Sequence, residues 1–182
     1  MLLADPNWDH VAEARLQGLP TYYGNPSSEH AEHHLELTGL GLLFALSPRT
    51  DLNTLTSLEF GKVFGRNKVY RLPPGERDLR LPAEIRRRHR RDQTLFGEKV
   101  TYAKLASLLG QGAEIRITGL TAAFAWEDYL AEHGDRVTPL FAVDPQGRVF
   151  PFGGVDQPEP GADWEVAGLI RASEPREQAN SG

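Results

Sequence analysis

The stretch GLLFALSPRTDLNTL, residues 41–55, decides the fold of the first part of the chain. The run from Leu40 to Leu46 is almost continuously apolar, which is typical of a parallel strand covered on both faces. After Pro48, a helix is predicted to begin at Asp51, because apolar residues then recur at helical spacing until Gly65. These apolar residues are Leu52, Leu55, Leu58, Phe60 and Val63. The stretch therefore predicts a strand followed by a helix, the repeating unit of an α/β sheet.

The same alternation continues on both sides of this stretch. Strands are predicted at Leu2–Ala4, Thr21–Tyr23 and Lys68–Leu72, and helices over Trp8–Leu16 and Glu29–Leu37. Helices between successive strands indicate βαβ units, so we expect the strands to be parallel.

Polar or small residues follow these strands at the ends where open α/β sheets bind ligands. They are Asp5 after the first strand, Gly24 and Asn25 after the second, and Ser47 after the third. A carboxylate at a strand end of a doubly wound sheet accepts hydrogen bonds from a ribose, and Asp5 stands in such a position. The alternative is that Asp5 only caps the helix that follows it.

Residues 2–72 resemble regulator-of-potassium-conductance (RCK) domains of the TrkA-N type. They are most similar to the version found in the cytosolic tails of bacterial sodium or potassium/proton antiporters. The resemblance is carried by Asp5, by GLPTYYGNPSSE (residues 18–29), by residues 41–55 and by EFGKVFGRNKVYRL (residues 59–72). It implies a Rossmann-like fold, with NAD or an adenine nucleotide as the candidate cofactor near Asp5, Gly24, Asn25 and Ser47.

One element of that family's pattern is absent from this sequence. Family members begin with a further strand and a G-x-G-x-x-G turn that holds a pyrophosphate at a helix N-terminus. No such turn occurs here, and the G-x-G of residues 39–41 precedes a strand instead of a helix. We therefore expect an α/β fold with an incomplete Rossmann-like parallel sheet, without the first strand and the Gly-rich loop. The chain is then a truncated tail, a subunit completed by another chain, or a domain that has lost its nucleotide.

Charge separates the first part of the chain from the rest. Residues 1–73 carry 6 basic and 8 acidic side chains, residues 74–100 carry 8 and 5, and residues 101–182 carry 6 and 12. The chain is accordingly divided into a TrkA-N/RCK-like α/β domain (1–73), a basic connector (74–99), a second domain (100–172) and a disordered tail (173–182).

The connector concentrates its charge in the sequence EIRRRHRR, residues 84–91. Its arginines are expected either to contact anionic lipid headgroups or an acidic domain, or to form a solvated linker. They are Arg86, Arg87, Arg88, Arg90 and Arg91. Nucleic-acid binding is not predicted, because the chain has a net charge of −5 and the basic run lacks interleaved aromatic residues.

The second domain is predicted to be a small α+β domain with antiparallel strands. A helix over Val100–Leu109 precedes a strand over Ala113–Thr118, whose alternating apolar and charged residues predict one solvated face. A compact helix contains Phe124, Trp126, Tyr129 and Leu130, and the turn DPQG (residues 144–147) predicts a hairpin. This order, with a final strand to Ile170, is similar to the accessory domain in the antiporter tails.

Candidate catalytic and metal-binding groups do not form a recognised pattern. The chain has no cysteine, no nucleophile elbow and no phosphate loop, so we expect no enzymatic activity. His30, His33 and His34 are the densest group of potential ligands, and His30 and His34 would share a helix face. They are expected to form a solvated surface, with proton sensing favoured over metal binding.

The sequence predicts a non-catalytic regulatory domain of a monovalent cation/proton antiporter. It would act as a homodimer at the cytoplasmic face of the inner membrane, attached to a transport domain outside this chain. This chain alone, which contains no apolar run of membrane-spanning length, is expected to be soluble. Two alternatives remain: a dimerisation scaffold that binds no small molecule, and a fragment of a nucleotide-dependent oxidoreductase.

Overall fold

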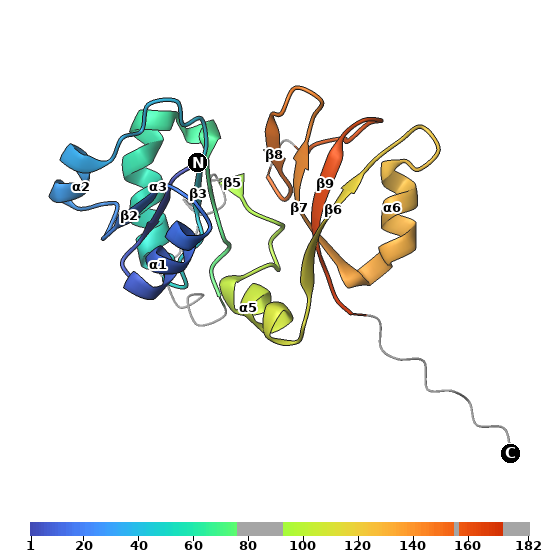
Figure 1. The fold of residues 1–182 in the computed structure, drawn as a ribbon, viewed down its shortest axis with the longest axis horizontal. Helices are drawn as coiled ribbons and strands as arrows, with labels where there is room; N and C mark the ends of the chain where they lie inside the picture. The colour runs from blue at the N-terminus through green and yellow to red at the C-terminus, as the bar shows by residue number, and fades with distance from the viewer. Residues whose placement is uncertain (76–92, 155–156, 173–182) are drawn as a thin grey trace, which may run out of the picture. The chain divides into compact units, whose positions relative to one another are not determined.

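The chain forms two compact units, Met1–Arg71 and Leu72–Gly182, in the computed structural model shown in Figure 1. The structure describes residues 1–75, 93–154 and 157–172. The arginines of the basic connector and the tail 173–182 lie outside the described residues. Within the described ranges, no helix has the length and apolar character needed to cross a membrane.

The first unit alternates short strands and helices, as predicted (Figure 1). Its elements are β1 (Leu3–Asp5), α1 (Trp8–Leu16), β2 (Thr21–Tyr23), α2 (Glu29–His34), β3 (Leu43–Ala45), α3 (Thr50–Phe64), the 3-10 turn η1 (Arg66–Lys68) and β4 (Val69–Arg71). The strands are short, with three residues each. Gly65 ends α3 with φ at +84°, a conformation that glycine adopts without steric cost.

The four strands of this unit form two separate parallel pairs. β1 pairs with β2 from Leu3 opposite Thr21 to Asp5 opposite Tyr23. β3 pairs with β4 in the same sense, and β1 and β3 belong to different sheets. This arrangement confirms the predicted α/β class with parallel strands, in two small sheets where one was expected.

Helix α3 buries its polar side. Asn53, Thr56 and Ser57 are buried together with Phe60. By contrast, Leu55, Leu58 and Val63 are 47%, 48% and 62% exposed, although they are among the residues that predict the helix. The leucines and valine of α3 therefore lie largely outward. The hydroxyl and amide groups on the buried side of the helix are available to the loops that follow the strands.

The second unit is an α+β unit with an antiparallel sheet, as predicted. Its elements are β5 (Gln93–Thr94), α5 (Tyr102–Gly110), β6 (Glu114–Gly119), α6 (Trp126–His133), the 3-10 turn η3 (Gly134–Arg136), β7 (Val137–Val143), β8 (Val149–Pro151) and β9 (Glu165–Ile170). The strand order in its four-stranded sheet is β6-β9-β7-β8, and every pair in that sheet is antiparallel. β7 and β8 form the hairpin that the turn sequence predicts.

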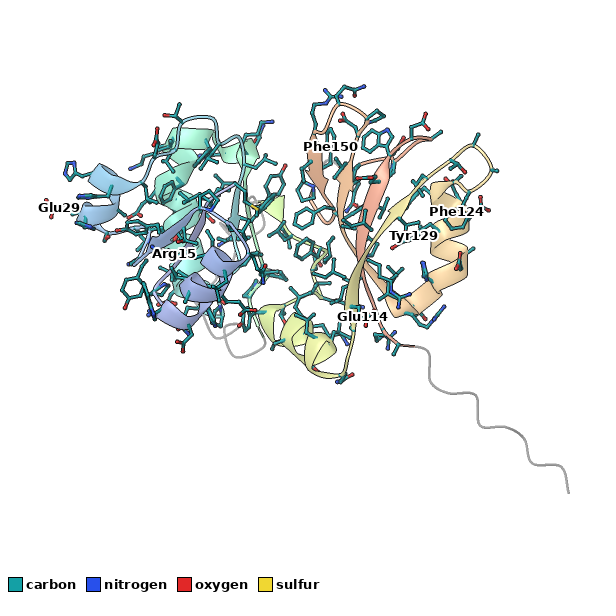
Figure 2. All side chains as sticks on the ribbon, viewed as in Figure 1. Arg15, Glu29, Glu114, Phe124, Tyr129 and Phe150 are labelled. Atoms are coloured by element: carbon teal, nitrogen blue, oxygen red, sulfur yellow. The ribbon has the colours of Figure 1, made fainter. Side chains whose placement is uncertain are left out.

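Two apolar clusters hold the helices of this unit to its sheet, and Figure 2 labels Tyr129 of α6, a member of the larger one. The buried residues of the larger cluster are Leu120, Tyr129, Ala142, Phe152 and Val166. Those of the smaller cluster are Leu108, Ala113, Leu140 and Leu169. Because α6 contributes to one cluster and α5 to the other, each helix has its own core.

The prediction that β6 has only one solvated face is wrong. Five of its six residues are exposed, and Ile115 and Ile117 are 60% and 69% exposed. β6 is at the edge of its sheet, and neither isoleucine belongs to the cluster that contains Leu108 of α5. The alternation of apolar and charged residues indicates a strand. It does not indicate whether another element covers the side of the sheet on which the isoleucines lie.

Candidate functional site

A backbone hydrogen bond connects the carboxyl ends of β1 and β2. The backbone N–H of Gly24 donates to the carbonyl oxygen of Asp5 at 3.0 Å. Gly24 has φ at +144°, and a Cβ atom at this position would lie 3.1 Å from the ring of Tyr22. The positive φ and this close approach both favour glycine where the two strand ends meet.

The carboxylate of Asp5 organises the start of α1. Its Oδ1 accepts the backbone N–H of Asn7 at 2.7 Å, and its Oδ2 lies 3.0 Å from Nδ1 of His10. Asn7, rather than Asp5, is the N-cap of α1, and it accepts the N–H of Asp9. A carboxylate has about four acceptor positions, so these two contacts leave others for a ligand. The side chain of Asp5 is 29% exposed and remains accessible.

The loop after β2 is tied to the polar side of α3. Oδ1 of Asn25 accepts the backbone N–H of Ser27 at 3.0 Å, which closes a tight turn. The hydroxyl of Ser27 then lies 3.2 Å from the hydroxyl of Thr56. The second predicted strand end is thus connected to the helix that follows the third strand.

The loop after β3 is held on the same helix. Asn53 accepts the backbone N–H of Ser47 at 3.0 Å and donates its own amide to the carbonyl oxygen of Ser47 at 2.8 Å. The hydroxyl of Ser47 accepts the N–H of Arg49 at 3.1 Å. Asn53 and Thr56 are three residues apart on α3, so this side of the helix receives both loops.

A cationic residue ends the fourth strand. Arg71 is the last residue of β4 and pairs in register with Ala45 of β3. It is 3% exposed, and its guanidinium donates to the hydroxyl of Thr54 at 2.9 Å. Arg71 was not among the predicted site residues, because the predicted strand runs to Leu72 and the structure ends β4 one residue earlier.

The remaining contributors that sequence reasoning missed are His10, Asn53 and Thr56. His10 follows Asp5 by five residues, a spacing that allows contact between a strand end and the first turn of the next helix. Asn53 and Thr56 have no such local signal, because their importance depends on loops that are distant in sequence.

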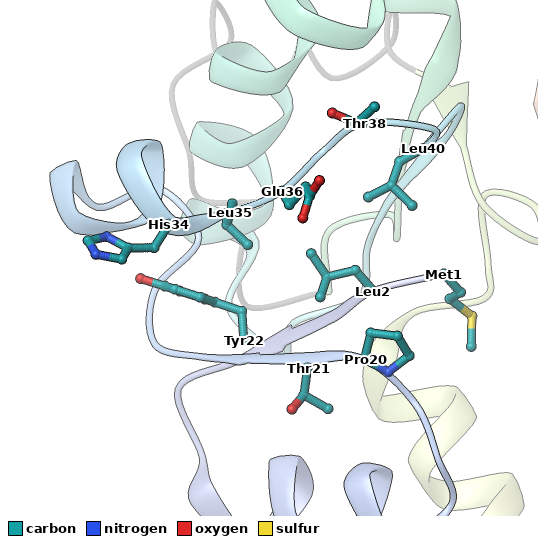
Figure 3. A pocket seen from close by; sticks show the side chains of 10 residues that line it. All are labelled: Met1, Leu2, Pro20, Thr21, Tyr22, His34, Leu35, Glu36, Thr38 and Leu40. Atoms are coloured by element: carbon teal, nitrogen blue, oxygen red, sulfur yellow. The ribbon is translucent and has the colours of Figure 1, made fainter.

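A hollow of the first unit lies elsewhere, at the amino ends of its strands. It has a volume of about 370 Å³, and its wall includes Leu2, Tyr22, Leu35 and Leu40. Figure 3 shows the side chains of Leu2, Leu35 and Leu40 directed into this hollow. None of Asp5, Gly24, Asn25 and Ser47 lines it. The predicted site is therefore a set of loops at the strand ends, separate from this hollow.

The histidines of α2 stack on one another. The rings of His30 and His34 lie 3.9 Å apart, and Nδ1 of His34 is 2.8 Å from the carbonyl oxygen of His30. The prediction that these two residues share a helix face is confirmed. Among the described residues, no group of three or more His, Asp or Glu side chains is arranged to hold a metal ion.

Comparisons with known proteins find similarity only among solved structures. No protein-family model matches the chain, and no curated protein matches it. A structure entitled "GsuK Channel" has a TM-score of 0.35 at 10% identity, covering 94% of this chain and 36% of that chain. The "GsuK channel bound to NAD" has a TM-score of 0.36 at 10% identity, with the same coverage. The "Crystal Structure of the GsuK RCK domain" has a TM-score of 0.29 at 10% identity, covering 94% of this chain and 43% of that chain. This chain therefore spans less than half the length of each of these structures.

Proposed function

We propose that the chain is a non-catalytic, ligand-sensing regulatory region of a monovalent cation/proton antiporter. The ligand class is a nucleotide, with NAD or an adenine nucleotide as the candidates. Support comes from the resemblance of residues 2–72 and from the arrangement of the strand ends in the first unit. The attached transport domain, the dimer and the location at the cytoplasmic face of the membrane are parts of the proposal.

The observation that carries the proposal is the connection of three strand ends. The end of β2 is hydrogen-bonded to the end of β1 through Gly24 and Asp5. The loops after β2 and β3 both contact the polar side of α3, at Thr56 and Asn53. Loops that meet at the carboxyl ends of parallel strands form the usual ligand site of an open α/β sheet.

The chemistry of these groups suits a nucleotide with an anionic part. The remaining acceptor positions of Asp5 can receive hydrogen bonds from ribose hydroxyls. The guanidinium of Arg71, which is held by Thr54, supplies positive charge at the end of β4. An arginine is a suitable partner for phosphate because its planar group donates several hydrogen bonds in a fixed geometry.

Regulation would follow from differential binding. A ligand that binds one arrangement of the regulatory region more tightly than another shifts the population toward that arrangement. The attached transport domain would then respond by no more than this difference in affinity. No chemical step is required, which agrees with the expected absence of catalysis.

A thermal-shift and calorimetric titration of the full chain with NAD, NADH, ATP and AMP tests the proposal. A ligand at 100 times its dissociation constant stabilises a folded protein by about 2.7 kcal/mol, which is a measurable shift. Asp5→Asn keeps the shape of the side chain but removes acceptor capacity, so we expect weaker binding. Asp9→Asn is the control, because it removes the same charge four residues away. If none of the four ligands shifts the unfolding temperature at millimolar concentration, the proposal that the chain binds a nucleotide is contradicted.

A dimerisation scaffold without a ligand is the second candidate. It is favoured by the local hydrogen bonds of the site, because Asp5, Asn25 and Ser47 each stabilise a turn of their own loop. This candidate predicts self-association with no response to nucleotides. Sedimentation and calorimetry on the same preparation separate the two functions.

A further inference from the structure

The edge strand β6 presents an exposed row of apolar side chains and an open backbone edge. Among the strands that the structure describes, β6 pairs only with β9. Ile115 and Ile117 are opposite Leu169 and Ala167 of β9, and cross-strand partners lie on the same side of a sheet. Both isoleucines are more than half exposed, at 60% and 69%. A long, apolar, exposed edge is a template for pairing with another strand.

The backbone groups available for such pairing are identified by the register of β6. The N–H of Leu120 donates to the carbonyl oxygen of Trp164, so Leu120 faces the strand at its inner edge. Backbone groups of alternate residues point to opposite edges of a strand. The N–H and C=O groups of Ile115 and Ile117 therefore point away from β9, toward the open edge.

Charge on the other side of β6 selects both the partner and the register. Glu114 and Arg116 lie two residues apart and form an ion pair at 3.1 Å, with side chains that are 68% and 64% exposed. Two antiparallel copies of β6 that are centred on Ile115 place Glu114 of each copy opposite Arg116 of the other. An antiparallel pairing centred on residue 116 instead places Arg116 opposite Arg116 of the other copy. Like charges directly opposite each other are destabilising.

We propose that β6 is a homodimer interface, at which two copies pair antiparallel with Ile115 opposite Ile115 of the second copy. Two Glu114–Arg116 pairs then cross the dimer axis, and the two sheets join into one. A symmetric, self-complementary surface is what a two-fold dimer requires. This inference identifies the interface of the dimer that the proposed function includes. It rests on the dimer of that proposal and not on its nucleotide.

Disulfide trapping tests the register directly, because the chain contains no cysteine. A central hydrogen-bonded pair has Cα atoms about 5.5 Å apart, within the range that a disulfide spans. Under mild oxidation, we expect Ile115→Cys to give a covalent dimer. Ile117→Cys is the matched control, because this residue lies four positions from its counterpart in the proposed register. Val149→Cys on the opposite edge strand is the second control. Faster trapping at Ile117 or Val149 than at Ile115 would overturn the proposed pairing.

Charge exchange tests the interface without a covalent bond. Each cross-strand ion pair is worth about 0.2–1 kcal/mol, and reversal of one charge replaces two attractions with two repulsions. In sedimentation equilibrium of the full chain, Glu114→Arg and Arg116→Glu should each raise the dimer dissociation constant about tenfold. The double variant E114R/R116E should restore dimerisation.

The outcomes of this experiment are independent of any ligand. A wild-type chain that stays monomeric at the highest concentration tested overturns the β6 interface and leaves nucleotide binding untouched. A dimer whose dissociation constant is unchanged in both single variants also overturns it. Conversely, charge-dependent self-association without a nucleotide response supports the interface and contradicts only the ligand claim.

Discussion

Gly168 in β9 lies directly against the hydroxyl group of Tyr129 in α6. A Cβ atom at residue 168 would overlap with this hydroxyl oxygen and would also lie 2.8 Å from Cγ2 of Val137. Tyr129 is completely buried and belongs to the larger cluster of the second unit. The close packing of α6 on the sheet therefore depends on a strand residue without a side chain.

We predict that Gly168→Ala destabilises the second unit by about 1–3 kcal/mol, the usual cost of extra atoms in a well-packed core. The urea unfolding midpoint is the measurement. Gly119→Ala is the control, because a Cβ atom at this strand residue meets nothing within 4 Å. In a Tyr129→Phe background, the cost of Gly168→Ala should decrease, since one of the two clashing groups is gone. Equal destabilisation by both glycine substitutions would contradict the packing argument.

The hydroxyl of Tyr129 has a testable energetic role of its own. Its oxygen is buried without a hydrogen-bond partner among the described residues. Because an unpaired buried hydroxyl is unfavourable, we expect Tyr129→Phe to leave stability unchanged or to raise it by up to about 1 kcal/mol. Tyr129→Ala should instead cost about 3–5 kcal/mol, as for other large aromatic truncations. Thermal unfolding of the two variants separates the contribution of the hydroxyl group to stability from that of the aromatic ring.

Alkaline pH provides a second measurement on the same residue. Burial raises the pKa of Tyr129. A group whose pKa is higher in the folded state contributes stability below its unfolded pKa of about 10, and this contribution is lost as the pH rises through the folded value. Between pH 9 and 11, the wild-type chain should therefore lose stability more steeply than Tyr129→Phe. Parallel curves would show that Tyr129 does not contribute to the pH dependence.

Asp144 should make the β7–β8 hairpin sensitive to acid. Burial would raise the pKa of its carboxyl group, but hydrogen bonds from the backbone N–H and guanidinium of Arg148 and from the N–H of Gln146 outweigh burial and lower it. A lowered pKa contributes stability above the unfolded value of about 3.9, and this contribution is lost as the pH falls through the folded value.

The test is thermal unfolding between pH 7 and pH 3. Asp144→Asn should lower the midpoint at pH 7, and its midpoint should depend less on pH than that of the wild-type chain. Asp163→Asn is the control, because Asp163 is an exposed acid of the same unit with φ at +65°, which asparagine tolerates. If both variants follow the wild-type curve, Asp144 is not an acid-sensitive group of the hairpin.

Local sequence signals predicted the elements better than they predicted which sides are buried. The helix predicted over Val100–Leu109 is observed as α5, and its N-cap Thr101 accepts the N–H of Lys104 within one helical turn. The stacking of His30 and His34 is also local. The burial of Asn53 in α3 and the exposure of Ile115 in β6 depend on segments that are distant in sequence. Hydrophobic period specifies the type of an element, whereas strand order and neighbouring loops determine its environment.

The same reasoning explains the partial prediction of the site. Asp5, Gly24 and Ser47 were identifiable because each follows a predicted strand. Their partners on α3 were not, since Asn53 and Thr56 lie among leucines that dominate the helical pattern. A polar residue at helical spacing gives no local sign that its side of the helix is the buried one.

Asn53 is therefore expected to be a structural support of the candidate site. It is 4% exposed, and its amide makes one donated and one accepted hydrogen bond with the backbone of Ser47. Asn53→Ala would leave both backbone groups of Ser47 without these partners, and a buried unsatisfied group costs about 1–3 kcal/mol. We predict a loss of stability in this range, measured by urea unfolding.

Asn67→Ala is the control for Asn53→Ala, because Asn67 is an exposed residue of the short turn η1 and its loss should change stability little. If the loop after β3 forms part of a nucleotide site, Asn53→Ala should also weaken nucleotide binding, although Asn53 is buried. Unchanged binding in a folded Asn53→Ala variant would separate the ligand from the Ser47 loop. Binding would then have to be assigned to the ends of β1 and β2 alone.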